Sequence, residues 1–535
     1  MKSESIPLVF SFPFPLLSLL IFTPWAGAVL LTLLRGASAL TARVLTLAFS
    51  LSTLAFSVLL LDSFDPAATA PQFGERQPWI AALNVHYHLG LDGLSLVLVL
   101  LTGIITPVAL LASWRLERSA RLFGALFLTL QGAALGVFLA LDFFHWFVFW
   151  ELSLVPAFFL IKLWGGRDAT RAAYQFVIYT IGGSAFMLFG FAALFATTGT
   201  FDFNELARLG ADGTLAAKLG AGPIQFIFLG VLFGLAVKVP LWPFHTWLPP
   251  AYAEAPTGAS MFLTGVMSKM GVYGFLRILW PIFPQQLHAA APWLLTLALG
   301  GVVLGAWAAL RQTDLKRMVA YSSVNHLSYC LLALFAVSYA TGRAGLSGEA
   351  ATAALSGTIL QMFNHGLSAA ALFACVGILQ TRADKNNMGG TPMPRGTGVS
   401  PLGLKDFGGV RAAAPIFAGL CGIAMFSSLG LPGLNGFVGE FLIFRGVFGL
   451  HPGAAAVACL GLLGTALFLL TFWQRVFHGP RAEAAAGEFS DLRGVEYAAL
   501  VPLVLLMFVL GVAPQLLTRL INPLVTAWAG HLVLP

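Results

Sequence analysis

The chain has 535 residues, of which 58% are hydrophobic and only 10% are charged. A soluble globular protein carries about 25% charged residues, so this composition excludes that class and predicts a polytopic membrane protein. The net charge of +7 would suggest an anionic partner for a soluble chain. In a membrane protein, the distribution of the basic residues is more informative than their sum.

Apolar runs of about 20 residues, the length that crosses a bilayer, predict an all-α protein with fourteen transmembrane helices. The first run follows Lys2 as in a secretory signal, but Glu4 and thirteen further runs favour a membrane span. The predicted helices lie at approximately 7–34, 39–61, 89–114, 120–140, 142–164, 172–198, 224–248, 256–281, 292–310, 316–338, 352–380, 412–446, 454–478 and 496–518.

Lys and Arg are distributed unevenly between the two sides of this predicted bundle. Loops after odd-numbered helices carry 19 of the 29 basic residues, whereas the opposite loops and helix ends carry six. By the positive-inside rule, the side with 19 faces the cytoplasm. We therefore expect a multi-pass protein of a bacterial-type inner (cytoplasmic) membrane, with both termini on the periplasmic side and the long connector 382–411 in the cytoplasm.

Lys238 lies near the middle of the seventh apolar run, in the segment GLAVKVPLWPFHTWLPP. A charge at this depth costs roughly 3 kcal/mol of insertion free energy, so it indicates an ion or proton pathway. Pro240 and Pro243 lack an N–H group, and we expect the carbonyls of Ala236 and Val239 to leave the helical hydrogen-bonding pattern. Interrupted helices of this kind are typical of transporter sites.

Five more ionisable side chains lie deep in predicted helices: Glu151, Lys269, His326, His365 and Glu440. Glu151 is about nine residues into its helix, roughly 13 Å along the axis, and a neutral core carboxyl is the alternative interpretation. A lone buried histidine is often structural, but two at matching depth favour a proton relay, because histidine titrates near physiological pH. His145, nearer a helix start, is expected at the membrane interface.

A second interruption, Leu429-Gly-Leu-Pro-Gly433, precedes Glu440 in the twelfth helix. It lies five helices after the first interruption, and because five is odd, helices 4–8 and 9–13 are predicted to form an inverted repeat. The repeat places Lys238 opposite Glu440 and Glu151 opposite His326. The predicted domains are helices 1–3 (1–119), the half through which protons enter (120–281), the half through which they leave (282–480), and helix 14 with the tail (481–535).

The four cysteines, Cys330, Cys375, Cys421 and Cys459, lie singly in predicted helices without CxxC spacing and are interpreted as core residues. The chain has neither a cysteine cluster for iron–sulfur ligation nor a dinucleotide fingerprint. We therefore expect no cofactor and no metal in this chain, and no nucleic-acid partner.

Six segments resemble, in order and spacing, motifs of the antiporter-like membrane subunits of respiratory complex I, NADH:quinone oxidoreductase. A glutamate at 440, where sister subunits tend to have lysine, points to the subunit M (chain 4) type. The segments are WELSLVPAFFLIKLWGG, AVKVPLWPFHTWLP, EAPTGASMFLTGVMSKMGVYGFLR, QTDLKRMVAYSSVNHLSY, LQMFNHGLSAAALF and SLGLPGLNGFVGEFL.

The resemblance implies a translocase subunit in which Glu151 and Lys238 form a charge pair where protons enter and Lys269 is the central lysine. It also implies that His326, His365 and Glu440 continue the path outward. Moving or neutralising Glu151 would release a proton from Lys238, because an ionised carboxylate favours a nearby lysine charge and burial disfavours it. NADH, FMN, iron–sulfur clusters and quinone are implied in partner subunits, and neighbouring antiporter-like subunits and the lipid bilayer are implied partners.

Three residues depart from the family pattern: Pro250 and Tyr252, in a segment that often reads Leu-Pro-Asp-Ala-His, and Gln175, often a lysine. They leave open how protons reach the central residues. The alternatives are a multi-subunit cation/proton antiporter, which Glu440 disfavours, and a subunit of a membrane-bound hydrogenase or ferredoxin-linked complex. A purely structural scaffold does not explain several buried charges that cost on the order of 10 kcal/mol together.

Overall fold

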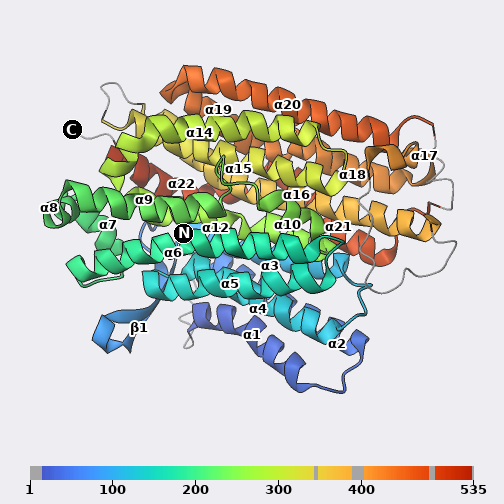
Figure 1. Ribbon diagram of the computed structural model, residues 1–535, viewed down its shortest axis with the longest axis horizontal. Helices are drawn as coiled ribbons and strands as arrows, with labels where there is room; N and C mark the ends of the chain where they lie inside the picture. The colour runs from blue at the N-terminus through green and yellow to red at the C-terminus, as the bar shows by residue number, and fades with distance from the viewer. Residues whose placement is uncertain (1–14, 343–346, 388–402, 481–488, 533–535) are drawn as a thin grey trace, which may run out of the picture.

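The computed structural model describes residues 15–342, 347–387, 403–480 and 489–532, which form a bundle of roughly aligned helices (Figure 1). Twelve of the described helices are long and apolar enough to cross a membrane, which confirms a multi-pass all-α protein. Each matches a predicted helix. They are α1 (Leu16–Leu33), α2 (Ala39–Ser63), α3 (Gly93–Ala112), α4 (Ala120–Leu139), α5 (Phe143–Trp164), α6 (Ala169–Thr198), α9 (Ala221–Lys238), α14 (Pro284–Leu310), α15 (Leu315–Ala340), α16 (Gly348–Asn387), α20 (Pro452–Phe477) and α21 (Gly494–Val512).

The predicted eighth helix is present as a series of short segments around Lys269. Its α-helical segments are α11 (Thr257–Phe262), α12 (Lys269–Gly274) and α13 (Trp280–Ile282). The π-helical turns η2 (Leu263–Met267) and η3 (Phe275–Leu279) join them. Wide turns of this kind occur frequently at functional sites, and here they lie on both sides of the buried lysine.

Both predicted interruptions are confirmed. α9 ends at Lys238 and the chain resumes as α10 (Leu248–Glu254), whereas the twelfth predicted helix divides into α18 (Pro415–Ser428) and α19 (Asn435–Leu450). As expected, the carbonyl of Ala236 leaves the i to i+4 pattern, and it accepts a hydrogen bond from the N–H of Leu241, five residues on, at 2.9 Å. The same five-residue step closes α18, where Leu431 N–H donates to Phe426 O at 3.0 Å. At the first interruption, the residue after Pro240 thus supplies the N–H that the proline lacks.

The predicted repeat pairs Lys238 with Glu440, but these residues lie on different sides of their interruptions, and the pairing of Glu151 with His326 stays a prediction. Lys238 is the last residue before the first interruption, whereas Glu440 lies after the second one, inside α19. The two residues therefore belong to different halves of their broken helices. The inverted relation of the two five-helix units, and the domain boundaries drawn from it, stay predictions.

The sequence missed a β-hairpin before the third helix. Strands β1 (Gln72–Ile80) and β2 (Val85–Leu91) pair antiparallel, with the 3-10 turn η1 (Ala81–Leu83) between them. The predicted helix start at 89 is thus wrong. α3 begins only after Asp92, whose side chain accepts the N–H of Ser95 at 3.0 Å and also pairs with Arg277 at 2.5 Å.

The fourteenth predicted helix also ends earlier than expected, at Val512, because Pro514 has no N–H to continue it. A further helix, α22 (Gln515–Leu532), follows and packs on the start of α3, where a Cβ on Gly93 would lie 2.2 Å from Leu520 O.

Cys459 on α20 is exposed, so its interpretation as a core residue is wrong. The remaining short elements are α7 (Phe203–Ala211), α8 (Thr214–Leu219), η4 (Leu404–Asp406) and α17 (Val410–Ala413).

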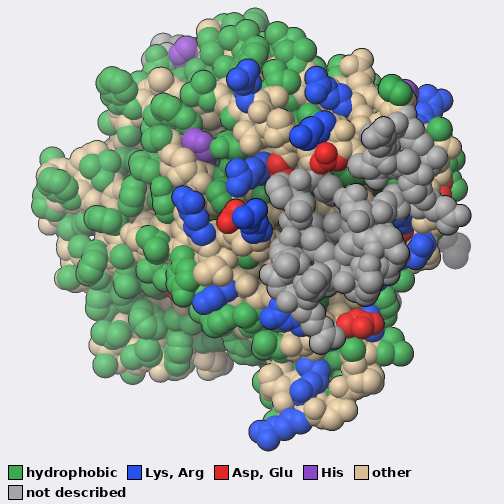
Figure 2. All heavy atoms as spheres, turned by 45° about the vertical axis from the view of Figure 1, so that its right-hand side comes forward, with side chains coloured by type: hydrophobic (Ala, Val, Ile, Leu, Met, Phe, Trp, Pro, Cys, Tyr) green, Lys and Arg blue, Asp and Glu red, His purple; other side chains and the backbone are tan. Residues whose placement is uncertain are grey.

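Lys and Arg side chains gather at one end of the bundle (Figure 2). The hairpin, α7 and α8 lie at one end and α17 at the other (Figure 1). Figure 2 turns the second end forward and shows Lys and Arg side chains gathered on it, with hydrophobic side chains covering the flank. This is the grouping that the positive-inside assignment requires. Half of the long connector 382–411, namely residues 388–402, lies outside the described residues.

Candidate functional site

Lys269, the first residue of α12, is completely buried. Its Nζ donates to the carbonyl oxygen of Thr264 in η2 at 2.5 Å and to Ser268 Oγ at 3.3 Å. It also lies 2.8 Å from Nδ1 of His365 on α16. An ammonium has three hydrogen atoms to donate, and these three contacts use all of them.

The two predicted histidines lie beside each other in the same buried region. His365 extends from α16 and His326 from α15, and their ring centroids are 5.2 Å apart. The Nε2 atom of each ring has no hydrogen-bond partner in the part of the chain that the structure describes. Each ring therefore keeps one nitrogen that can accept or release a proton.

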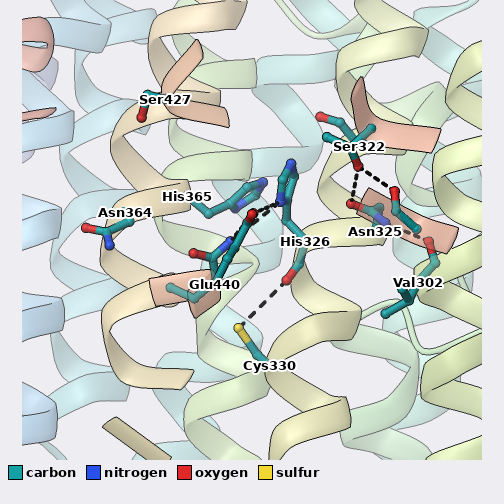
Figure 3. A network of polar contacts seen from close by, with 12 residues as sticks. Val302, Ser322, Asn325, His326, Cys330, Asn364, His365, Ser427 and Glu440 are labelled. Atoms are coloured by element: carbon teal, nitrogen blue, oxygen red, sulfur yellow. Dashed lines mark hydrogen bonds and ion pairs between the residues drawn. The ribbon is translucent and has the colours of Figure 1, made fainter. Parts of the chain in front are cut away.

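Glu440 of α19 completes this cluster from the other side. Its Oε1 lies 3.0 Å from His326 Nδ1 and accepts a hydrogen bond from Gln361 Nε2 at 3.2 Å. Figure 3 shows Glu440, His326 and His365 directed toward one another between their helices. Four of the six predicted residues, Lys269, His365, His326 and Glu440, thus form a continuous series of contacts across α12, α16, α15 and α19. We call this series the central relay.

Sequence reasoning missed Gln361, which lies one helical turn before His365 on α16 and is buried. Its Nε2 lies 3.5 Å from His326 Nδ1 as well as bonding Glu440. A neutral amide in an apolar helix costs less than a charge and so attracts less attention. The only signal in the sequence was its four-residue spacing from His365, which puts both side chains on one helix face.

The other two predicted residues have very different surroundings. Lys238 is buried, and its Nζ lies 5.0 Å from the ring centre of Trp150 and 5.9 Å from that of Phe176. Lys238 Nζ and Glu151 Oε1 have no hydrogen-bond partner among the described residues. The two groups are close enough to influence each other electrostatically, as a charge pair requires, but they form no direct ion pair. Aromatic faces hold the ammonium instead.

No hydrogen bond joins the two lysines within the described chain. Lys238 is directed toward rings of α5 and α6, whereas Lys269 contacts α16. The helices that carry them pack tightly, since a Cβ on Gly271 would lie 2.4 Å from Val239 Cγ2. The structure therefore separates the six predicted residues into an aromatic site with two members and the central relay with four.

The three departures from the family pattern have different surroundings. Tyr252 is buried, and its hydroxyl donates to Leu263 O in η2 at 3.0 Å. Gln175 is at the surface and donates to Thr246 O at 3.2 Å, and Pro250 lies within α10. His145 is at a helix start as expected, but the hairpin covers it, and its ring lies 4.6 Å from that of Tyr87.

A cavity of about 590 Å³ opens at the basic end of the bundle. Its lining includes Arg115, Glu254, Lys316 and Arg317, and none of the six predicted residues. Burial raises the pKa of Glu254, whose Oε2 accepts the N–H of Asp168 at 3.0 Å. The cavity thus lies at the basic end of the bundle near α10 and α11, away from the relay.

The chain matches known proteins over nearly its whole length. Residues 140–467 match the family described as NADH:quinone oxidoreductase/Mrp antiporter, TM. The chain is 35% identical over 527 residues to NADH-quinone oxidoreductase subunit M of Rhodobacter capsulatus, covering 97% of this chain and 96% of that one. It is 37% identical over 487 residues to F(420)H(2) dehydrogenase subunit M of Methanosarcina mazei, covering 88% and 90%.

Two solved structures share the fold. A chain of respiratory complex I from Thermus thermophilus with bound NADH superposes with a TM-score of 0.79 at 29% identity, covering 96% of this chain and 99% of that one. A chain of the Mrp complex from Dietzia sp. superposes with a TM-score of 0.79 at 19% identity, covering 97% and 100%. At that identity the second likeness concerns the fold alone.

Proposed function

Because the chain belongs to the NADH:quinone oxidoreductase/Mrp antiporter transmembrane family, we propose that it is the proton-translocating M-type subunit of a NADH-quinone oxidoreductase. The single observation that carries the proposal is the central relay. A membrane interior keeps buried ionisable groups in contact only at a cost, and such groups mark proton pathways. The subunit works in a complex with other membrane subunits, as its relatives do.

In this function each residue of the central relay holds a proton in turn. A proton on Lys269 Nζ moves to His365 Nδ1 across the 2.8 Å contact, and His326 Nδ1 passes one to Glu440 Oε1 across 3.0 Å. Transfer between the two rings requires a carrier or a ring movement, because their centroids are 5.2 Å apart. Glu440 then releases the proton outward.

Glu151 and Lys238 control the relay electrostatically. A tenfold change in a protonation equilibrium corresponds to about 1.4 kcal/mol, and moving one charge through 100 mV of membrane potential costs roughly 2.3 kcal/mol. A change in the distance between Glu151 and Lys238 that alters the protonation equilibrium of Lys238 tenfold therefore has a free energy comparable to that of moving a charge through the membrane potential. Such a change is large enough to favour proton movement in one direction. The cation–π contacts keep Lys238 in place while Glu151 acts on it.

The electron-transfer chemistry belongs to partner subunits, which hold NADH, FMN, iron–sulfur clusters and quinone. Neighbouring antiporter-like subunits lie beside this chain in the inner membrane. The basic end faces the cytoplasm, and both termini lie on the periplasmic side. The names of the relatives support NADH and quinone as substrates of the complex, and the grouping of Lys and Arg supports the cytoplasmic side of the basic end.

A second candidate has the same proton chemistry and a different electron donor. It is favoured by the 37% identity to a subunit of F(420)H(2) dehydrogenase. A deazaflavin-type donor would change the partner subunits that oxidise it and leave the central relay unchanged. Assays of the purified complex with NADH and with reduced F420 separate the two candidates.

Glu440→Gln tests the relay directly, because the amide keeps the shape of the side chain and cannot carry a proton. We expect normal assembly and loss of most quinone-linked proton transfer in reconstituted vesicles. Glu440→Lys restores a titratable group and should retain some pumping. If Glu440→Gln pumps like the parent complex, the outward step belongs to another residue, first of all His365.

A further inference from the structure

The interruption between α18 and α19 is held by three polar side chains without charge. Ser427 Oγ donates to Asn435 Oδ1 at 2.6 Å, and Asn435 Nδ2 donates to Asn364 Oδ1 of α16 at 3.2 Å. In return, Asn364 Nδ2 donates to the backbone carbonyl of Asn435 at 2.6 Å. We call Ser427, Asn364 and Asn435 the asparagine clasp; Figure 3 shows Asn364 and Ser427 beside the relay.

Stability alone does not account for the asparagine clasp. All three side chains are buried, Ser427 and Asn435 completely. Interhelical hydrogen bonds in membrane proteins contribute only about 0.6–2 kcal/mol each, and well-packed apolar side chains would do as well. What the three bonds add is a defined position: they fix the end of α18, the start of α19 and the middle of α16 relative to one another.

That position determines where Glu440 lies. Glu440 follows Asn435 by five residues on the same helix, roughly 7.5 Å along its axis. On α16, Asn364 immediately precedes His365 and lies less than one turn after Gln361, which bonds Glu440. A rotation or slide of α19 against α16 would therefore move the Glu440 carboxylate relative to His326.

Two glycines on α19 pack closely against neighbouring segments and so limit movement of this helix. A Cβ on Gly436 would lie 1.9 Å from Ser427 O, and one on Gly439 would lie 2.7 Å from Gln361 Oε1.

The two carboxylate oxygens of Glu440 have different neighbours. Oε1 contacts His326, whereas a Cβ on Gly430, in the interruption, would lie 2.9 Å from Oε2. The carboxylate thus bridges the relay and the interruption that the asparagine clasp holds.

We propose that the asparagine clasp positions Glu440 for the last step of the relay, so that Asn364, Asn435 and Ser427 are positioning residues for proton transfer. In this step the N–H bond at His326 Nδ1 breaks and an O–H bond forms at Glu440 Oε1, with no other reactant. The proposal rests on the role proposed for Glu440. The titratable groups that surround the carboxylate are His326, Tyr329 and Cys330 on α15, His365 on α16 and Lys269 on α12.

The test compares Asn435→Ala and Asn364→Ala with a matched control in the whole complex. Asn325→Ala also removes a fully buried amide, one that donates to Val302 O at 2.6 Å and accepts from Thr465 Oγ1 at 3.2 Å, away from the interruption. The readout is the pH titration of the Glu440 carboxyl infrared band, identified by its disappearance in Glu440→Gln. We expect the midpoint to change by about one pH unit in both clasp variants and to stay within about 0.2 units in the control.

Ser427→Ala keeps the experiment decisive if the asparagine variants assemble poorly. It removes one donor only and should change the midpoint by a smaller amount in the same direction. An unchanged midpoint in all clasp variants, or an equal change in Asn325→Ala, overturns the proposal. The infrared midpoint does not depend on pumping, so a parent complex that fails to pump would refute the proposed function and leave this result standing.

Discussion

Lys238 and Lys269 share a sequence signal and differ in almost everything around it. Each is a buried lysine beside a helix irregularity, the end of α9 for one and the π-helical turn η2 for the other. The ammonium of Lys238 lies over the rings of Trp150 and Phe176 without a hydrogen-bond partner among the described residues. The ammonium of Lys269 makes three polar contacts, one of them to a histidine nitrogen.

The difference separates holding a charge from passing a proton. An aromatic face attracts a cation but has no lone pair that can take its proton. The unprotonated nitrogen of a neutral imidazole has such a lone pair. Lys238 is therefore suited to respond to Glu151 as a charge, and Lys269 is suited to release a proton to His365. A buried lysine beside a broken helix is found in both cases, so this sequence signal does not separate a lysine that holds a charge from one that passes a proton. The groups in contact with the ammonium separate the two roles.

The largest effect is expected at Lys269. Lys269→Met removes the first residue of the central relay and should lower proton pumping by about a hundredfold. Lys269→Arg keeps the positive charge but cannot release a proton, so we expect it to be as inactive as the methionine variant. Pumping in reconstituted vesicles, with assembly checked separately, is the measurement. Substantial pumping by Lys269→Arg would mean that this lysine is a fixed charge, and the contrast with Lys238 would disappear.

A smaller effect is expected at the aromatic site. Glu151→Gln removes the charge that acts on Lys238 and should reduce coupled turnover about tenfold, whereas Glu151→Asp should retain part of the activity. Because Glu151 has no direct contact with the ammonium, the loss should be smaller than at Lys269. Equal losses at the two positions would place Glu151 on the proton path itself, and full activity of Glu151→Gln would exclude it from control.

The sequence was sufficient where the signal is local. A lysine, glutamate or histidine inside an apolar run is conspicuous without a structure, because its insertion is costly, and all six candidates were found in this way. Both interruptions were found because proline removes a backbone donor. Length and hydropathy predicted fourteen helices; twelve of them are single long helices in the described residues, and the eighth and twelfth are divided into shorter segments.

What could not be predicted depends on packing between distant segments. The contact of His326 with Glu440 joins α15 to α19, and the contact of Lys269 with His365 joins α12 to α16. Gln361 and Asn435 carry no charge and so were not conspicuous, and the only signal for Gln361 was its spacing from His365. The hairpin was missed because the apolar residues of β2 run directly into α3 and resemble the start of a helix.

The position of α19 offers a third test of the central relay. A Cβ on Gly439 would lie 2.7 Å from Gln361 Oε1 and 3.0 Å from Gln361 N, so Gly439→Ala must push α19 away from α16. Overpacking of this kind costs about 1–3 kcal/mol, and we expect a lower unfolding temperature and several-fold slower pumping. Gly419→Ala on α18 is the matched control, because nothing lies within 4 Å of its Cβ position. A helical alanine there should be neutral or slightly stabilising.

The smallest effect is expected at the outer rim of the half that contains Glu151. Asp202, before α7, pairs with His88 of β2 at 2.9 Å. Burial alone would raise the pKa of Asp202, but hydrogen bonds from His88 and the backbone of Glu205, together with nearby positive charge, leave that pKa below its usual value. A carboxylate with a lowered folded-state pKa stabilises the fold above its unfolded pKa of about 3.9, and this contribution is lost as the pH falls through the folded value.

Asp202→Asn should therefore loosen the hairpin at pH 7 by about 0.5–1 kcal/mol, after allowance for solvent screening. The difference from the parent should shrink at a pH well below the unfolded pKa of about 3.9, once the carboxylate is protonated in the folded state as well. Amide hydrogen exchange of β2, at pH 7 and at the low pH, measures this difference in stability between Asp202→Asn and the parent. Asp212→Asn, in the exposed turn between α7 and α8, is the matched control and should leave the exchange of β2 unchanged. If Asp202→Asn also lowers pumping as much as Glu151→Gln, the outer rim acts on the aromatic site, and the control of Lys238 extends from Glu151 to the hairpin.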